Sequence, residues 1–198
     1  MSILSSPHIY NLWDYISRRP GALADITRTL VKPFDGCRIL DIGCGTSNIL
    51  NHLPTTVLYD GLDLSHDYIQ YARKRWAGRG CRFECRAIED SGLPQKATYD
   101  VVLAIGVLHH LDYYAAKELI RSAYRVLKSG GALVTYDPVI IPNQNRIARC
   151  IMEHDRGRYI RTVGEYFHLL YPDFDGLGVV NHNRLRYPYT IWEGRFTK

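Results

Sequence analysis

The sequence lacks the features that mark membrane spans, secretion signals and nucleic-acid grooves. No run approaches the roughly 18 consecutive apolar residues of a transmembrane helix. Residues 1–10 show no basic stretch followed by an apolar one, which is the pattern of a signal peptide. The net charge is only +5 over 198 residues, and no block of basic residues indicates a nucleic-acid groove. We therefore expect no transmembrane segment and no nucleic-acid partner.

Metal-binding spacing is also missing from the five cysteines of the chain. Cys81 and Cys85 would share one face of a strand with Phe83, so we expect them to fill core rather than to bind zinc. An odd number of free thiols is typical of a reducing compartment. The cysteines therefore predict a cytoplasmic protein without a metal site.

Repeats and low-complexity linkers are absent as well. A length of 198 residues, with 46% hydrophobic and 23% charged residues, is ordinary for one globular domain with a substantial core. We expect a single domain over residues 1–198. The sequence does not indicate its oligomeric state.

The most informative stretch that is present runs from Arg38 to Leu50. It predicts a short strand that ends near Asp41, then a glycine turn with Gly43 and Gly45, and then a helix whose apolar segment starts at Ile49. The turn is followed by residues that favour helix N-termini, namely Thr46, Ser47 and Asn48. Strand, glycine turn and helix together can bring bare backbone against a ligand, although an ordinary turn between a strand and a helix would need glycines too.

The spacing of the glycines bears on the choice of ligand. A dinucleotide-binding turn has the pattern G-x-G-x-x-G, and the third glycine position here is Asn48. The stretch D-x-G-x-G-T-x resembles instead the first motif of class I S-adenosylmethionine-dependent methyltransferases, and is similar to the UbiE-like branch. The resemblance implies that Asp41, Gly43, Cys44 and Gly45 lie around the methionyl end of the cofactor. Members of that family often have a third glycine at the position of Ser47.

A second strand is expected over residues 57–65, with Asp63 near its carboxyl end. An ionised carboxylate there can accept hydrogen bonds from both hydroxyls of a ribose. The resemblance gives Asp63 this role and places Leu64 beside the cofactor. A simpler interpretation makes Asp63 a helix-capping acid, although Ser65 and Asp67 could cap the next helix without it.

Two further segments complete the cofactor site that the resemblance implies. After a third strand over residues 81–87, Ile88 would lie against the adenine ring and Glu89 would meet its amino group. Asp90 is an equally available acid for that amino group, and a solvated loop is the alternative. The near-continuous apolar run 99–106 predicts a central parallel strand. Because ligands bind beyond the carboxyl ends of such strands, we expect Ile105 and Gly106 beside the cofactor.

The run Y-D-V-V-x-x-x-x-V-L-H-H-L at residues 99–111 resembles the fourth motif of UbiE-like methyltransferases. It places His109 and His110 near the reaction centre. Methyl transfer depends mainly on holding the acceptor in line with the donor, and a base is needed only when the acceptor must lose a proton. We interpret His109 and His110 mainly as structural residues that cap and bridge the loop, and His110 is the candidate for a catalytic role.

The rest of the chain is expected to cover the site. Residues 7–30 are predicted to be helical. The resemblance implies that they form a lid over the cofactor, from which Tyr10, Trp13, Tyr15 or Arg18 could touch ligand; the alternative is that Trp13 and Ile16 only seal a helix onto the domain. Beyond a fifth strand at 132–136 we expect helices at 144–154 and 162–170 and an antiparallel pair at 177–184 and 187–196. Candidates for acceptor contacts are Tyr10, Asp137, Arg158 and Tyr166, with a solvated basic connection or a turn-forming acid as the alternatives.

The order of elements predicts an α/β fold, a doubly wound, mostly parallel seven-stranded sheet with helices on both faces, a closing antiparallel pair and an N-terminal helical lid. We divide it into a lid (1–35), a cofactor-binding core (36–139) and an acceptor side (140–198). The resemblance implies transfer of a methyl group from S-adenosylmethionine to a small-molecule acceptor. The alternatives are an RNA methyltransferase, although no N/D-P-P-Y motif follows the fourth strand, a nicotinamide-dependent oxidoreductase, and a non-catalytic cofactor-binding module.

Overall fold

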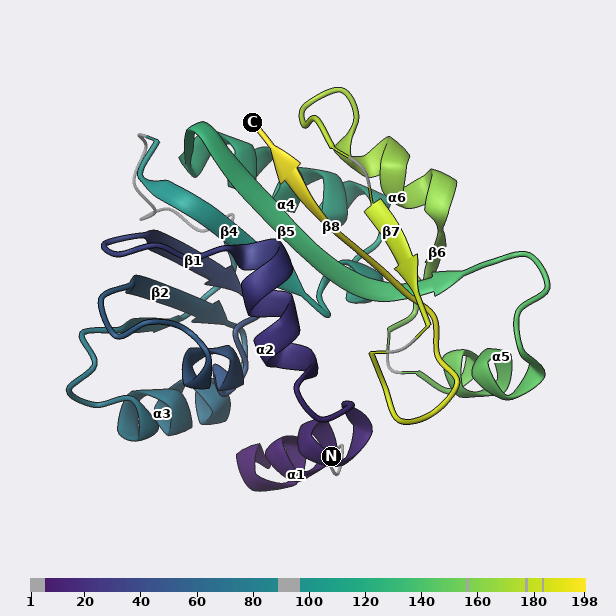
Figure 1. Ribbon diagram of the computed structural model, residues 1–198, viewed down its shortest axis with the longest axis horizontal. Coiled ribbons are helices and arrows are strands. Elements are labelled where there is room, and N and C mark those ends of the chain that lie inside the picture. The colour runs from purple at the N-terminus through teal and green to yellow at the C-terminus, as the bar shows by residue number, and fades with distance from the viewer. Residues whose placement is uncertain (1–5, 89–96, 156, 177, 183) are drawn as a thin grey trace.

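A computed structural model describes residues 6–88, 97–155, 157–176, 178–182 and 184–198. Its centre is an eight-stranded sheet in which seven strands follow the order β3-β2-β1-β4-β5-β8-β7 and the short β6 pairs with β5 (Figure 1). The strands are β1 (Arg38–Ile42), β2 (Leu58–Asp63), β3 (Arg82–Cys85), β4 (Tyr99–Ile105), β5 (Leu127–Ile140), β6 (Arg161–Thr162), β7 (Gly178–Asn181) and β8 (Ile191–Thr197).

The pairing directions agree with the predicted doubly wound sheet. β1 pairs in parallel with both β2 and β4, and β4 pairs in parallel with β5. β8 runs antiparallel to both β5 and β7. The chain moves outward from β1 to β3 on one side and from β4 onward on the other, so the order reverses between β1 and β4. Such a switch point opens a crevice at the carboxyl ends of the strands.

Helices cover both faces of the sheet. On one face, α4 (Tyr113–Val126) and α6 (Val163–Leu170) pack on a core that includes Leu40, Val102 and Leu133. On the other, α2 (Ala22–Ile26), the π-helical turn η2 (Thr27–Val31) and α3 (His66–Arg75) pack on a core that includes Ile39, Val101 and Val134. Consecutive residues of β1, β4 and β5 therefore serve opposite faces, as strands buried on both sides require.

Several boundaries differ from those predicted. The helix expected from Ile49 is only the short 3-10 turn η3 (Asn48–Asn51), and β5 extends on both sides of the predicted 132–136. The closing pair is shorter than expected, since Arg184 and Tyr187 lie outside β7 and β8. Cys85 is exposed, so the expectation that it fills core with Phe83 is wrong. The remaining helices are η4 (Leu108–His110) and α5 (Arg146–Glu153).

The N-terminal helix α1 (Pro7–Ser17) stands apart from the sheet and lies against α3, as Figure 1 shows. The rings of Tyr10 and Tyr68 lie 5.0 Å apart, and the His8 ring meets the edge of Tyr71 at 5.3 Å. Within the described ranges, no helix is long and apolar enough to cross a membrane.

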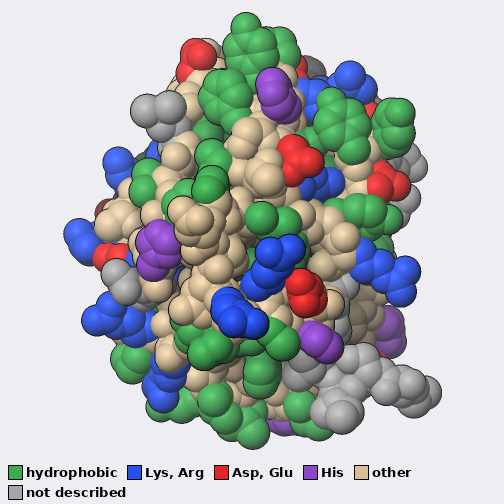
Figure 2. All heavy atoms as spheres, turned by 90° about the vertical axis from the view of Figure 1, so that its right-hand side faces the viewer, with side chains coloured by type: hydrophobic (Ala, Val, Ile, Leu, Met, Phe, Trp, Pro, Cys, Tyr) green, Lys and Arg blue, Asp and Glu red, His purple; other side chains and the backbone are tan. Residues whose placement is uncertain are grey.

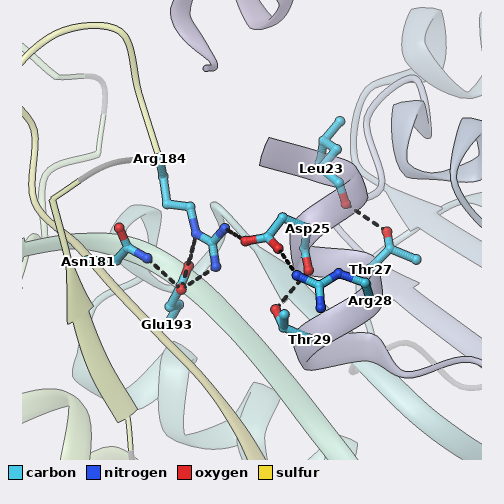
Figure 3. A network of polar contacts seen from close by, with 8 residues as sticks. All are labelled: Leu23, Asp25, Thr27, Arg28, Thr29, Asn181, Arg184 and Glu193. Atoms are coloured by element: carbon cyan, nitrogen blue, oxygen red, sulfur yellow. Dashed lines mark hydrogen bonds and ion pairs between the residues drawn. The ribbon is translucent and has the colours of Figure 1, made fainter. Parts of the chain in front are cut away.

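A network of ion pairs around Arg184 ties α2 to β8 (Figure 3). Arg184 forms three hydrogen bonds with the carboxylate of Glu193 on β8, at 2.6 to 3.1 Å, and a further ion pair with Asp25 on α2. The backbone continues the connection, because Arg19 N donates to the Arg184 carbonyl at 3.0 Å and Arg186 N donates to the Ser17 carbonyl at 2.9 Å. The turn between α1 and α2 is therefore fixed to the segment that follows β7.

Replacing Arg184 by alanine should lower the free energy of unfolding by about 3–5 kcal/mol, because it leaves the buried Glu193 carboxylate without its cation. Urea denaturation monitored by tryptophan fluorescence measures the loss. Arg28→Ala is the matched control, since Arg28 pairs with the same Asp25 but is exposed, and it should cost less than about 1 kcal/mol. Equal losses in the two variants would contradict this account of the network.

Candidate functional site

The site is built on a glycine turn at the carboxyl end of β1. Gly43 and Gly45 both have positive φ, at 68° and 54°. A Cβ on Gly43 would lie 2.5 Å from Val107 Cγ2, and one on Gly45 would lie 3.4 Å from the Tyr10 ring. Any residue other than glycine would therefore be strained here and would fill the crevice between β1 and β4.

Ser47 explains why the predicted helix does not form. It has φ 56° and ψ 43°, which is the left-handed region, and it is almost fully buried. A left-handed residue interrupts a regular α-helix at its start, so the chain makes only the short turn η3. The same conformation accounts for the glycine that the family often has at this position, because glycine adopts it without steric cost.

Asp63, at the end of β2, holds the glycine turn in place. Gly45 N donates to its Oδ2 at 2.8 Å, and Ser65 N donates to its Oδ1 at 2.8 Å. Partial burial raises the pKa of Asp63, while these backbone hydrogen bonds oppose the rise. A carboxylate has about four lone-pair sites, so Asp63 keeps acceptor capacity beyond the backbone hydrogen bonds from Gly45, Ser65 and Leu64. Ser65 caps α3 by accepting from Tyr68 N at 3.3 Å, so Asp63 is not the helix cap.

Asp41 lies beneath the turn. Tyr59 Oη donates to its Oδ2 at 2.5 Å, and burial raises the pKa of Asp41 to about 7 from an ordinary value of 3.8. Cys44 is buried beside Gly61, where a Cβ would lie 2.9 Å from the Cys44 sulfur. These contacts make the turn a packed element rather than an exposed loop.

The remaining cofactor candidates lie in different environments. Ile88 is buried in the core, Ile105 lines the cavity over the turn, and Leu64 is 76% exposed next to Asp63. Gly106 has φ 72°, and its N–H donates to the Tyr136 carbonyl at 2.7 Å. Glu89 lies outside the described residues.

The helix α1 closes over this turn with its polar side. Asn11 Oδ1 accepts from Thr46 Oγ1 at 2.5 Å and from Asn48 Nδ2 at 3.1 Å. Asp14 accepts from Asn48 Nδ2 at 3.2 Å and from Arg18 Nε at 2.5 Å. Asn11 and Asp14 were not predicted as site residues, although helical spacing places them with Arg18 on one polar face of α1.

A small cavity of about 40 Å³ remains between α1 and the turn. It is lined by Tyr10, Asp14 and Arg18 from the lid and by Asp41, Gly43, Ser47 and Ile105 from the sheet, among others. Pockets for small-molecule ligands measure about 300–1,000 Å³, so this cavity alone does not hold a nucleoside. The lid also carries an unsatisfied donor, since Arg18 Nη1 is buried with no hydrogen-bond partner among the described residues.

The two histidines have different surroundings. His109 is buried, and its Nδ1 lies 2.7 Å from Asp137 Oδ1, which also accepts the His109 backbone N–H at 3.1 Å. Its Nε2 lies 3.7 Å from Asp155 Oδ1, and the His109 carbonyl accepts from Tyr159 N. His109 therefore bridges β4, β5 and the segment after α5. His110 is exposed, with its ring 4.1 Å from that of His109.

Two expected acceptor contacts prove to be structural. Tyr166 is fully buried, stacks on Trp192 at 4.7 Å and donates to the Pro138 carbonyl at 2.9 Å, so its assignment to the acceptor was wrong. Asp137 is also fully buried, and it binds His109 rather than facing an open surface. Arg158 is exposed beyond α5. Figure 2, which views this side of the molecule, shows basic, acidic and histidine side chains scattered among hydrophobic ones.

The strand order, the glycine turn at the switch point and the carboxylate at the end of β2 are typical of α/β domains that bind nucleosides. Residues 39–131 match a family model described as a methyltransferase domain. This part of the chain, just under half of its length, is thus similar to the class I S-adenosylmethionine-dependent methyltransferases.

Individual relatives agree with this assignment. A ubiquinone biosynthesis O-methyltransferase of Xylella fastidiosa is 30% identical over 123 residues, covering 61% of this chain and 44% of that protein. A 27-O-demethylrifamycin SV methyltransferase of Amycolatopsis mediterranei is 33% identical over 114 residues, covering 54% and 41%. The chain therefore spans less than half of either relative. The solved structure of an S-adenosylmethionine-dependent methyltransferase of Methanosarcina mazei has the same fold, with a TM-score of 0.66 at 18% identity over 83% of this chain and 94% of that one.

The raised pKa of Asp41 predicts a pH-dependent stability. Between about pH 4 and pH 7 the unfolded carboxyl ionises while the folded one keeps its proton, so the free energy of unfolding falls as pH rises across this window. Asp41→Asn removes this contribution. Its stability relative to the wild type should therefore increase from pH 4 to pH 7, by a few kcal/mol at most, as urea titrations at each pH would measure.

Tyr59→Phe provides the control. It removes the hydrogen bond that favours the ionised carboxylate, so the decline in stability should continue to a higher pH than in the wild type. A difference between Asp41→Asn and the wild type that does not change with pH would contradict a raised pKa at this position.

Proposed function

We propose that this protein transfers a methyl group from S-adenosylmethionine to a small-molecule acceptor in a reducing cytoplasm. The observation that carries the proposal is the pairing of Asp63 with the Gly45 backbone at the β1–β4 switch point. This hydrogen bond places a carboxylate that would bind the ribose hydroxyls beside a glycine turn that would contact the amino-acid part of the cofactor.

The residues at the site suit this cofactor. The remaining acceptor capacity of Asp63 would serve the ribose hydroxyls, and Leu64, Ile88 and Ile105 would supply apolar surface for the nucleoside. The methionyl end would lie against Gly43 and Gly45. The unpaired and buried Nη1 of Arg18 would bind the carboxylate of the methionyl group, since an unsatisfied guanidinium donor inside a protein calls for an anion.

When bound, S-adenosylmethionine supplies a methyl group on a sulfonium that is already positively charged. What remains for the protein is to hold the acceptor in line and to exclude water, and such positioning is worth roughly 7–11 kcal/mol of barrier. The lid helix α1 would exclude water over the turn. His110 is exposed beside the buried His109–Asp137 pair, so it is the residue that could take a proton from a hydroxyl acceptor.

The names of the relatives favour small organic acceptors, with ubiquinone biosynthesis and a rifamycin among them. Nothing in the sequence between β4 and α4 follows the N/D-P-P-Y pattern of enzymes that methylate base amino groups. Asn48 stands where a dinucleotide turn needs its third glycine. We therefore rank RNA methylation and nicotinamide-dependent oxidation below small-molecule methyl transfer.

Asp63→Ala should weaken binding of S-adenosylhomocysteine about 10- to 100-fold, because hydrogen bonds to a charged group contribute about 1.5–3 kcal/mol each. Isothermal titration calorimetry measures the change. Binding of 5′-methylthioadenosine, which keeps the ribose, should weaken to a similar degree. An unchanged dissociation constant for both nucleosides in a folded variant would count against the ribose assignment.

Arg18→Met tests the other end of the cofactor with the same two ligands. It should weaken S-adenosylhomocysteine about tenfold, the effect of losing one hydrogen bond between charged groups. It should leave 5′-methylthioadenosine unaffected, because that nucleoside has no carboxylate. Equal losses for both would show that Arg18 acts through the lid as a whole rather than on the carboxylate.

Methyl transfer itself is tested by incubating the protein with S-adenosylmethionine labelled in the methyl group and a panel of hydroxylated quinones, phenols, polyketides and fatty acids. Label should appear in one class of acceptor and be absent with Asp63→Ala. If the cofactor binds tightly and no panel member accepts label, the protein is better described as a cofactor-binding module.

A further inference from the structure

The helix α1 presents its polar side to the protein. Asn11 and Asp14 make hydrogen bonds to the glycine turn and to Arg18. Trp13 and Ile16 lie on the opposite side of the helix and are 51% and 50% exposed, so the expectation that they seal the helix onto the domain is wrong. The inward side of α1 therefore contributes polar and charged groups to the cavities beside it.

The larger of these cavities measures about 380 Å³. It lies between the polar side of α1, the turn that joins α1 to α2, the short turn η3 and the end of α3. Its volume is within the range of small-molecule pockets, about 300–1,000 Å³. Asp14, Arg18 and Asn48 also line the small cavity over the glycine turn, so the two cavities are neighbours. A ligand of the larger cavity would lie beside the cofactor site.

The lining of the larger cavity is strongly cationic. Four arginines line it, namely Arg18, Arg19, Arg75 and Arg186. Asp14 is the only acid among the described lining residues, and it already pairs with Arg18 at 2.5 Å. Across the described ranges no carboxylate pairs with Arg19, Arg75 or Arg186. A concave surface lined by one sign of charge concentrates the potential that attracts the opposite charge, so this cavity favours an anion.

Two of these guanidinium groups are held in place without a ligand. Arg75 donates to Asn48 Oδ1 at 2.9 Å, and its guanidinium carbon lies 4.9 Å from the centre of the Trp76 ring. Arg186 donates to the backbone carbonyl at the end of α1 at 3.1 Å, and its guanidinium carbon lies 6.0 Å from the centre of the Tyr15 ring. Each group keeps further N–H donors. Because both side chains are already positioned, binding an anion would cost less side-chain entropy.

The number of donors favours a phosphate group over a carboxylate. A phosphate ester carries up to about two negative charges near neutral pH and three acceptor oxygens, and each guanidinium fork matches two such oxygens. A carboxylate has one charge and two oxygens for the same three arginines. The cavity is also larger than a phosphate group alone, and Pro20 and Leu23 give it an apolar wall. Both features indicate a phosphate that belongs to an organic molecule.

We propose that this cavity binds a small organic phosphate. Arg19, Arg75 and Arg186 would bind the phosphate group, and Pro20 and Leu23 would contact the organic part. The three arginines come from the turn after α1, from α3 and from the segment between β7 and β8. A bound phosphate would therefore join three elements that are far apart in the sequence. The proposal does not rest on methyl transfer, because none of these five residues is assigned to the cofactor or the acceptor.

Isothermal titration calorimetry of the full chain at constant ionic strength, without cofactor, tests the proposal with three probes. Phenyl phosphate should bind most tightly, because its ring would cover the apolar wall. Inorganic phosphate should bind more weakly, since it leaves that wall exposed. Benzoate should bind least tightly of the three, because it keeps the ring but has a single negative charge.

Arg75→Gln/Arg186→Gln should weaken the binding of phenyl phosphate about tenfold or more, the effect of losing hydrogen bonds between charged groups. Arg121→Gln/Arg149→Gln is the matched control, because it removes the same charge from exposed positions on α4 and α5. Screening by salt limits the long-range effect of these charges, so the control should leave the affinity nearly unchanged. Arg75→Lys/Arg186→Lys keeps the charge without the planar forks and should restore only part of the affinity.

Folding of the variants is checked by their melting temperatures without ligand. Arg75 and Arg186 are exposed, so the unliganded variants should melt close to the wild type. Saturating phenyl phosphate should raise the melting temperature of the wild type and of the control pair, and raise that of Arg75→Gln/Arg186→Gln much less.

Four results would overturn the proposal. They are no binding of phenyl phosphate up to millimolar concentration, equal losses in the Arg75/Arg186 and control pairs, benzoate that binds as tightly as phenyl phosphate, and inorganic phosphate that does so. S-adenosylhomocysteine separates this site from the cofactor site. It should not displace phenyl phosphate, and displacement that continues without limit as its concentration rises would assign these arginines to the cofactor instead. Phosphate binding in a protein that fails to transfer methyl groups would contradict only the proposed function.

Discussion

The hydrogen bond from Gly45 N to Asp63 is the constraint on which the site depends. It connects the ends of β1 and β2, fixes two residues of positive φ, and keeps one carboxylate at the mouth of the crevice. A buried carboxylate is costly unless it is well hydrogen-bonded. Here backbone N–H groups supply those bonds while leaving acceptor capacity for a ligand. The same contact therefore stabilises the turn and fixes the position of the carboxylate.

The lid follows from the polarity of that turn. Thr46 and Asn48 direct polar groups toward α1, so α1 must direct polar residues toward the turn. Asn11 and Asp14 provide these contacts. In this eleven-residue helix one face makes the polar contacts, so the apolar residues lie on the opposite face. Exposure of Leu12 and Trp13 is thus the consequence of covering a polar turn.

What the sequence could predict depended on local signals. The strand at 99–105, the glycine turn and Asp63 at a strand end were each predicted from a few neighbouring residues, and the sheet has the strands and the turn at these positions. Periodicity identified which residues of α1 share a face, but not which face meets the protein, because that depends on Thr46 and Asn48 thirty-five residues away. The prediction that Tyr166 contacts the acceptor was wrong for a similar reason, because its burial depends on stacking against Trp192 from β8. The left-handed conformation of Ser47 could not be predicted from its residue type, because serine usually caps helices in an extended conformation.

The most direct measurement is a crystal structure of the protein with S-adenosylhomocysteine. The account predicts the nucleoside across the ends of β1, β2 and β4, with the Asp63 carboxylate accepting from both ribose hydroxyls, the amino-acid tail against Gly43 and Gly45, and α1 displaced enough to admit it. A crevice left empty at saturating ligand, or a nucleoside bound with its ribose far from Asp63, would contradict it.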